Sequence, residues 1–289
     1  MPTVTAGAAL SAAEGEGTLG LRTLAAADLS DALAPFLPHF VKETLRCGGA
    51  AHLVREGPRW IGLLLVDPLE NVVSVFTRSA ALVERTIHDP SGRSVYAEVD
   101  LDLPREVFAI YAAELAREPT HRFRHPVELL GDEEDRSVRS LVEETHGQLR
   151  RPWALPPAGG AESRFGVRLG GELVGVAWLA LAGRSARLHT LGVRAGYRRL
   201  GIGTDLLFGR MLWAWQAGAR RVVSEISAGN VASRAVAEKG GLRQVGQGFF
   251  YRGAPQVRPS SDPDPRFDYV RLAPQNGQVA AVESMSEPQ

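Results

Sequence analysis

A basic turn containing two glycines is the part of the sequence whose residues could most directly do chemistry. It reads Arg-Arg-Leu-Gly-Ile-Gly-Thr over residues 198–204 and lies between an apolar strand-like run (188–193) and an amphipathic helix-like run (205–216). Two glycines two residues apart let the backbone approach a phosphate without Cβ clashes, and the amides then open into a helix N-terminus, which favours anions. The turn therefore indicates an anion-binding loop, although a glycine pair alone is also common in ordinary turns.

The glycine spacing excludes two common nucleotide-binding loops. A dinucleotide fingerprint needs a third glycine at the position of Leu206, and the Gly-Lys-Ser/Thr of a P-loop is absent. Arg-x-x-Gly-x-Gly between a strand and a helix instead resembles the pyrophosphate loop of the GNAT superfamily of acyl-CoA N-acyltransferases. The resemblance covers residues 160–250. Residues 188–207 are similar to the family's fourth strand, loop and third helix, and Asn230 with residues 235–242 is similar to its next helix and turn.

The resemblance implies a site for acetyl-CoA as a co-substrate. The CoA pyrophosphate would lie on the loop, and the pantetheine arm would pair like an extra strand with residues 191–193, whose amides would face the thioester carbonyl. Asn230 is interpreted as a helix N-cap from its position and as a CoA-arm contact from the resemblance, and both can hold. The CoA-binding residues implied are Leu191, Gly192, Val193, Arg198, Arg199, Leu200, Gly201, Ile202, Gly203, Thr204 and Asn230.

Amine acetylation needs a base, because a primary amine with a pKa of about 10.4 is almost wholly protonated at pH 7. His189 lies on the same strand face as Leu191 and Val193, and its ordinary pKa near 6.5 suits proton uptake through a water. Aralkylamine-type members of the family carry a histidine at the matching place. Where some members carry a glutamate base, this chain has Arg187. The alternative is a histidine that only fills a half-buried strand face.

The residue at the family's general-acid position differs from the family's pattern. Many members carry a tyrosine in the helix after the asparagine, which protonates the departing thiolate, but the matching residue here is Ala237. Tyr251 is the catalytic substitute that we predict, with Tyr197 and Ser233 as alternatives. Loss of an acid need not abolish turnover, because a thiolate with a pKa of about 8.5 is a tolerable leaving group.

The predicted elements suggest an internal repeat. Two predicted hairpins align at a constant offset of 113, which matches Val54, Arg55, Gly57 and Gly62 to Val167, Arg168, Gly170 and Gly175. In the first copy, residues 79–88 follow where the second has its phosphate loop, and they contain no glycine. We therefore expect a first unit without a CoA site, which acts as a scaffold or as one wall of the substrate cleft.

The predicted fold class is α/β, an α+β mixed sheet with the GNAT fold in two tandem units, the first degenerate. The predicted domains are a disordered tail (1–18), a degenerate GNAT-like domain (19–120), a catalytic GNAT domain (121–273) and a second disordered tail (274–289). Hydrophobic periodicity predicts helices over 28–45, 79–88, 104–117 and 133–147, and strands over 19–24, 51–57, 59–66, 72–78 and 125–131. Phe249, Phe250 and Tyr251 are predicted to line an acceptor pocket or to fill the core.

Composition limits the function classes. Basic and acidic residues balance at 33 each with a pI near 7.1, which favours neither a nucleic acid nor a membrane as partner. The longest apolar run, residues 60–66, is far too short to span a membrane, and neither Cys47 nor any Cys/His spacing suggests a disulfide or a metal site. We expect a cytoplasmic enzyme without metal, and a homodimer is left open.

These observations together predict an N-acetyltransferase that transfers an acetyl group from acetyl-CoA to a primary amine of a small molecule, by direct attack in a ternary complex. Two alternatives stay open. One is a non-catalytic acyl-CoA-binding or regulatory module, which Ala237 and the degenerate first half would suit. The other is acetylation of an amine on a protein or peptide, which would need a groove as wide as a peptide.

Overall fold

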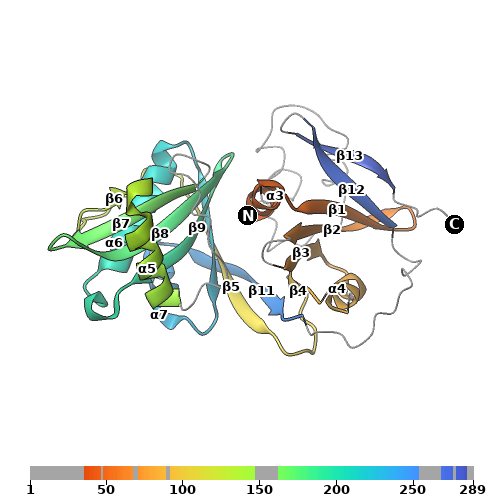
Figure 1. Cartoon of the computed structure of the whole chain (residues 1–289), viewed down its shortest axis with the longest axis horizontal. Coiled ribbons are helices and arrows are strands. Elements are labelled where there is room, and N and C mark those ends of the chain that lie inside the picture. The colour runs from red at the N-terminus through yellow and green to blue at the C-terminus, as the bar shows by residue number, and fades with distance from the viewer. Residues whose placement is uncertain are drawn as a thin grey trace. The chain divides into compact units, whose positions relative to one another are not determined.

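The computed structural model describes residues 36–46, 48–67, 71–88, 92–146, 162–253, 268–275 and 278–284. The chain forms two compact units (Figure 1). The first contains the chain up to Phe108 and again from Gly246, and the second runs from Ala109 to Val245. The predicted tail 1–18 and strand 19–24 lie outside the described residues, as does the beginning of the helix predicted over 28–45. A domain boundary near residue 120 stays a prediction, because the division of the chain into compact units does not show where two repeats join.

The second unit is built on a mixed sheet whose strands follow the order β5, β10, β9, β8, β7, β6. Strands β9 and β10 are parallel, and the pairs β9–β8, β8–β7 and β7–β6 are antiparallel. The bounds are β5 Glu106–Glu114, β6 Glu128–Leu129, β7 Glu162–Leu169, β8 Glu172–Ala182, β9 Ser185–Val193 and β10 Arg221–Ser227.

Helices cover both faces of this sheet because strand β8 carries apolar side chains on both faces (Figure 1). Helix α5 (Asp135–His146) packs on the face that carries Trp178, and α6 (Ile202–Gln216) and α7 (Val231–Lys239) pack on the other. Gly175 allows α6 to come close, since a Cβ there would lie 2.7 Å from Ile202 Cγ2. The unit therefore buries a core on each side of the sheet.

A bulge interrupts β9 just before its C-terminal end. Gly192 pairs with Val176 and His189 with Trp178, so two residues of β9 oppose one of β8, and Thr190 has a positive φ of 48°. Arg210 of α6 is buried beneath this point, and its Nη1 donates to the carbonyl oxygens of Trp178 (2.8 Å) and His189 (3.1 Å). Helix α6 thus satisfies backbone acceptors at the irregularity.

The first unit contains a sheet ordered β13, β12, β1, β2, β3, β4, β11. Its hairpin β1–β2 shifts register between Val54 and Arg55, and β7–β8 of the second unit shifts at the aligned residues Val167 and Arg168. Strands β3 and β4 are parallel and joined by α4, as β9 and β10 are by α6. The bounds are α3 Leu37–Arg46, β1 Ala50–Glu56, β2 Arg59–Asp67, β3 Val72–Thr77, α4 Ala80–Ile87, β4 Ser94–Ala97, β11 Arg243–Tyr251, β12 Asp268–Gln275 and β13 Gln278–Ser284.

Two predicted elements are wrong. The helix predicted over 104–117 is strand β5, whose central residues are buried on both faces. A short apolar run of this kind cannot be told from a buried helix by periodicity, and its Val, Ile and aromatic residues favour a strand. The disordered tail predicted over 274–289 contains β13, which pairs antiparallel with β12. The predicted hairpins and the helices α4 to α7 are confirmed.

Candidate functional site

An open cavity of about 1340 Å³ lies in the second unit, where the end of β9 meets the beginnings of α6 and α7. Ten of the eleven predicted CoA-binding residues line it, and Leu200, which is exposed, is the one that does not. The remaining lining comes from residues 121–124, the end of α5, Tyr197, Asp205 of α6 and five residues of α7. The structure thus brings the predicted loop, strand end and helix cap to one cavity.

The loop itself has an unusual backbone. Arg199 and Gly201 have positive φ angles of 65° and 95°, and Gly201 is the N-cap of α6 without any side-chain cap hydrogen bond. The amides of Thr204 and Asp205 bond to the carbonyl of Gly201, within the first turn. A helix start without a side-chain cap presents N–H groups and a positive dipole end to the cavity. This is a backbone arrangement that suits an anion.

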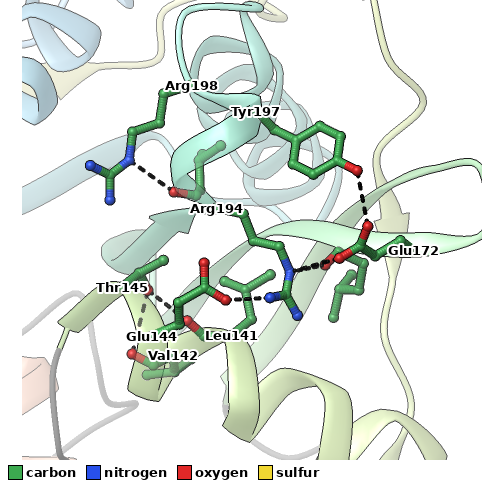
Figure 2. Close-up of polar contacts among 10 residues, drawn as sticks. Leu141, Val142, Glu144, Thr145, Glu172, Arg194, Tyr197 and Arg198 are labelled. Atoms are coloured by element: carbon green, nitrogen blue, oxygen red, sulfur yellow. Dashed lines mark hydrogen bonds and ion pairs between the residues drawn. The ribbon is translucent and has the colours of Figure 1, made fainter.

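The turn before the loop is held by Arg194 (Figure 2). Its guanidinium group donates to Glu144 of α5 and to the carbonyl oxygen of Leu173 (3.0 Å), and forms an ion pair with Glu172 of β8 (3.3 Å). Tyr197 donates its hydroxyl to the same Glu172 at 2.9 Å. That hydrogen bond raises the pKa of Tyr197, which makes this tyrosine a weaker acid than usual.

A histidine that the sequence reasoning missed also lines the cavity. His146 ends α5, and its Nδ1 lies 2.8 Å from Thr145 Oγ1. A Cβ on Gly192 would lie 3.2 Å from His146 Cε1 and 2.4 Å from Thr145 Oγ1, so the imidazole stands beside the end of β9. Burial lowers the pKa of His146. A hydrogen bond with the backbone of Val142 raises it by less. A lowered pKa favours the neutral form of this imidazole near pH 7.

The predicted base His189 does not line the cavity. Its ring packs edge-on against Trp178 with centroids 5.7 Å apart, and its Nδ1 lies 3.2 Å from Thr190 Oγ1. Its catalytic role stays a prediction. Arg187, at the place of the family's glutamate, forms an ion pair with Glu225 of β10 (Nε to Oε2, 2.9 Å), so a carboxylate is supplied by the neighbouring strand.

The predicted general acid Tyr251 lies in the first unit, where its geometry disagrees with that role. It is 1 % exposed, accepts a hydrogen bond from the amide of Leu101 and donates one to the carbonyl of Val99, both at 2.8 Å. Burial raises the pKa of Tyr251 by more than the hydrogen bond from Leu101 lowers it. Phe249 is buried in the same core. Both aromatic residues therefore serve packing in place of an acceptor pocket.

Helix α7 carries the remaining candidates. Asn230 is its N-cap, because its Oδ1 accepts from the amide of Ser233 at 3.1 Å, and both residues line the cavity. Ala237, at the family's tyrosine position, is buried in the core. Among the described residues, no cluster of His, Cys, Asp and Glu could hold a metal ion. None of the described helices combines the length and apolar character needed to cross a bilayer.

Comparisons with known proteins agree with this geometry. Residues 127–242 match the model of the Acetyltransferase (GNAT) family, and no curated protein matches the chain. A GCN5-related N-acetyltransferase from Kribbella flavida is 13 % identical, with 76 % of this chain and 95 % of that chain covered and a TM-score of 0.51. A GNAT-family acetyltransferase from Colwellia psychrerythraea is also 13 % identical, with coverages of 76 % and 90 % and a TM-score of 0.51.

A Drosophila protein covers more of the chain. It is 12 % identical, with 88 % of this chain and 97 % of that chain covered and a TM-score of 0.54. At such identities the structural likeness shows the fold alone, and the matched family model supplies the class of enzyme. Residues 127–242 are therefore a domain of the GNAT acetyltransferase family, and the chain that contains this domain is an acyltransferase.

Proposed function

We propose that this chain transfers the acetyl group of acetyl-CoA to a primary amine of a small molecule, by direct attack while both substrates are bound. The observation that carries the proposal is the cavity in which the uncapped start of α6, the end of β9 and the N-cap of α7 meet. These are three backbone-rich elements that a long anionic thioester could contact along its length.

The residues present fit acetyl-CoA. The loop offers free space over Gly203, since a Cβ there would touch only Leu191 and Val236, each at 3.7 Å. The pyrophosphate would bind the amides at the start of α6 with Arg198 and Arg199 beside it. The pantetheine arm would run along residues 191–193, whose amides would stabilise the oxyanion of the tetrahedral intermediate.

The chemistry then needs a proton acceptor near the end of β9. We infer that His146 takes this role, because a neutral imidazole stands beside Gly192 in the cavity. The amine nitrogen would form a bond to the thioester carbon and lose its proton to His146, directly or through a water. The C–S bond then breaks, the CoA thiolate takes up a proton, and the products are the amide and free CoA. His189 is the second candidate for the base.

We further infer that the first unit shares the architecture of the second but has no CoA site. Its helix α4 begins with Ser79, whose Oγ accepts from the amide of Leu82 at 3.3 Å, and Thr77 Oγ1 accepts from the amide of Ser79 at 2.9 Å. These side-chain oxygens accept hydrogen bonds from backbone amides at the start of α4, whereas the start of α6 has no side-chain cap hydrogen bond. The corresponding helix start is therefore closed to a phosphate.

The test measures free thiol released from acetyl-CoA in the presence of a panel of small primary amines. We expect acceptor-dependent release with at least one amine, and loss of both release and CoA binding in Gly203→Val. Gly196→Val is the control, because Gly196 has open space around it and does not line the cavity. Tight CoA binding without acceptor-dependent thiol release would overturn the proposed reaction, and unchanged binding in Gly203→Val would overturn the proposed site.

A further inference from the structure

Residues 121–125, which we call the HRFRH segment, lie along helix α6 beside the cavity and are not part of the loop. They are attached to Asp205, in the first turn of α6, whose side chain is 2 % exposed. Asp205 Oδ1 lies 2.7 Å from His121 Nε2, and Oδ2 lies 2.8 Å from His125 Nδ1. The amides of Arg124 and His125 also donate to this carboxylate, at 3.3 Å and 3.1 Å.

Burial alone would raise the pKa of Asp205, but the hydrogen bonds from His121, His125 and the two amides together lower it. The carboxylate is therefore ionised and can only accept, so both imidazole rings donate to it. The ring of His121 also stacks on Phe208 of α6, with centroids 4.3 Å apart and planes 6° apart. The segment is thus fixed to α6 at two successive turns.

The contacts of the segment separate its anchors from its cations. His121 and His125 bind Asp205, and Phe123 packs edge-on against His121 at 4.9 Å. Arg122 and Arg124 line the cavity and are exposed. Within the part of the chain that the structure describes, neither guanidinium group has a carboxylate partner.

Arg124 lies directly beside the phosphate loop. A Cβ placed on Gly201 would meet Arg124 Cδ at 3.3 Å and its Nη1 at 3.8 Å. The cavity is lined by five cationic side chains and by a single carboxylate, that of Asp205, which is already saturated with donors. The five are Arg122, Arg124, Arg198, Arg199 and Lys239. This excess of positive charge favours a ligand with more anionic groups than one pyrophosphate.

We propose that the HRFRH segment is a second phosphate-binding wall, on which Arg122 and Arg124 bind the ribose 3′-phosphate of CoA. The inference rests on the proposed function, since it assigns one further group of the same ligand. The loop amides take the pyrophosphate, and the arginines, held in place through Asp205, take the phosphate that distinguishes CoA from its 3′-dephospho form. The enzyme therefore selects acetyl-CoA over acetyl-3′-dephospho-CoA.

The test is a pair of titration series by calorimetry, with CoA and with 3′-dephospho-CoA. We expect the wild type to bind CoA about tenfold or more tightly than 3′-dephospho-CoA, as the loss of a charge-assisted hydrogen bond predicts. Arg122→Gln/Arg124→Gln should lose about tenfold or more in affinity for CoA and stay within about twofold for 3′-dephospho-CoA. Arg136→Gln is the matched control, an exposed arginine of α5 in the same unit that does not line the cavity.

The outcomes separate this inference from the proposed function. An equal loss of affinity for both ligands in the double variant would mean that the arginines bind the pyrophosphate, and it would overturn the assignment. Unchanged affinity for both ligands would also overturn it. A wild type that binds neither ligand, or a Gly203→Val variant that binds both normally, would instead overturn the proposed CoA site itself. Both arginines are exposed, so their replacement leaves the core and the Asp205 contacts of the backbone in place.

Discussion

The two glycines of the loop meet different physical demands. Gly201 has a φ of 95°, a conformation that L side chains rarely adopt, whereas a Cβ on Gly203 would make only ordinary contacts. The fold therefore requires the first glycine, and nothing in the packing requires the second. A ligand that approaches the backbone closely gives a reason for Gly203 that the structure alone does not.

Alanine at these two positions should accordingly affect different properties, the stability at Gly201 and the CoA affinity at Gly203. Gly201→Ala should lower the free energy of unfolding by about 1–2 kcal/mol, because a left-handed backbone is strained for alanine. Gly203→Ala should leave the free energy of unfolding unchanged within about 0.5 kcal/mol and should weaken CoA binding. Urea denaturation and calorimetry measure the two effects. A Gly203→Ala variant with lost stability and unchanged CoA affinity would mean that this glycine serves the fold.

His146 predicts a pH dependence whose sign follows from its lowered pKa. A base works only when unprotonated, so kcat/KM should fall as the pH drops through that pKa, which lies below the ordinary 6.5. His146→Gln should lower kcat at pH 7 by about 10²–10⁴-fold and remove this acidic limb. The loss should shrink at high pH, where free amine accumulates.

His189→Gln is the natural comparison, because both histidines are candidates and only His146 lines the cavity. We expect this variant to keep the acidic limb and most of its turnover. If the limb disappears in His189→Gln and persists in His146→Gln, the base is the strand histidine that the sequence pattern indicated. Pre-steady-state thiol release at several pH values distinguishes the two.

At the scale of elements, Asp205 joins the HRFRH segment to α6. Asp205→Asn should lower the free energy of unfolding at pH 7 by about 1.5–3 kcal/mol, the usual worth of hydrogen bonds to a charged group. The folded-state pKa of Asp205 is lowered, so its stabilisation is present above the unfolded-state pKa near 3.9 and is lost as the pH falls through the folded-state pKa. The wild-type and variant stabilities should therefore converge at the acid end.

Denaturation at a series of pH values measures this convergence. Glu143→Gln removes one carboxylate from an exposed position of α5 in the same unit and serves as the control. The control should track the wild type within about 0.5 kcal/mol. A gap between wild type and Asp205→Asn that stays constant down to low pH would show that the ionised carboxylate is not the source of the stability.

Local sequence patterns predicted the helices, strands and loops that have strong local signals. They failed to predict the elements whose structure is decided by pairing with residues distant in the sequence. The loop, α6 and the Asn230 cap follow from glycine placement, helical periodicity and capping chemistry within a few residues. The sequence of strand β5 was interpreted as a helix because its apolar run does not alternate with polar residues. Its place beside β10 is decided by tertiary pairing. His146 gave no signal, because its nearness to Gly192 exists only once α5 packs on the sheet.

At the scale of the whole molecule, one sequence pattern supports two units of similar architecture. The aligned register shifts at Val54 and Val167 are informative because a bulge is a specific backbone feature and not a general property of hairpins. Gly62 and Gly175 both lie under a helix, with a Cβ at Gly62 2.8 Å from Leu82 of α4. The two units thus share this register shift and this glycine position, and they differ in how the following helix begins.

That difference predicts the binding stoichiometry of the chain. The start of α4 is capped by Ser79, whereas that of α6 has no side-chain cap, so one CoA should bind per chain. Calorimetry on the full chain should give a stoichiometry near one, and Gly203→Val should reduce it to zero. Ser79→Ala removes the cap and should lower the free energy of unfolding by about 1 kcal/mol without creating a second site, because no glycine precedes α4 to admit a phosphate. Residual CoA binding in Gly203→Val would instead show that the first unit kept a working site.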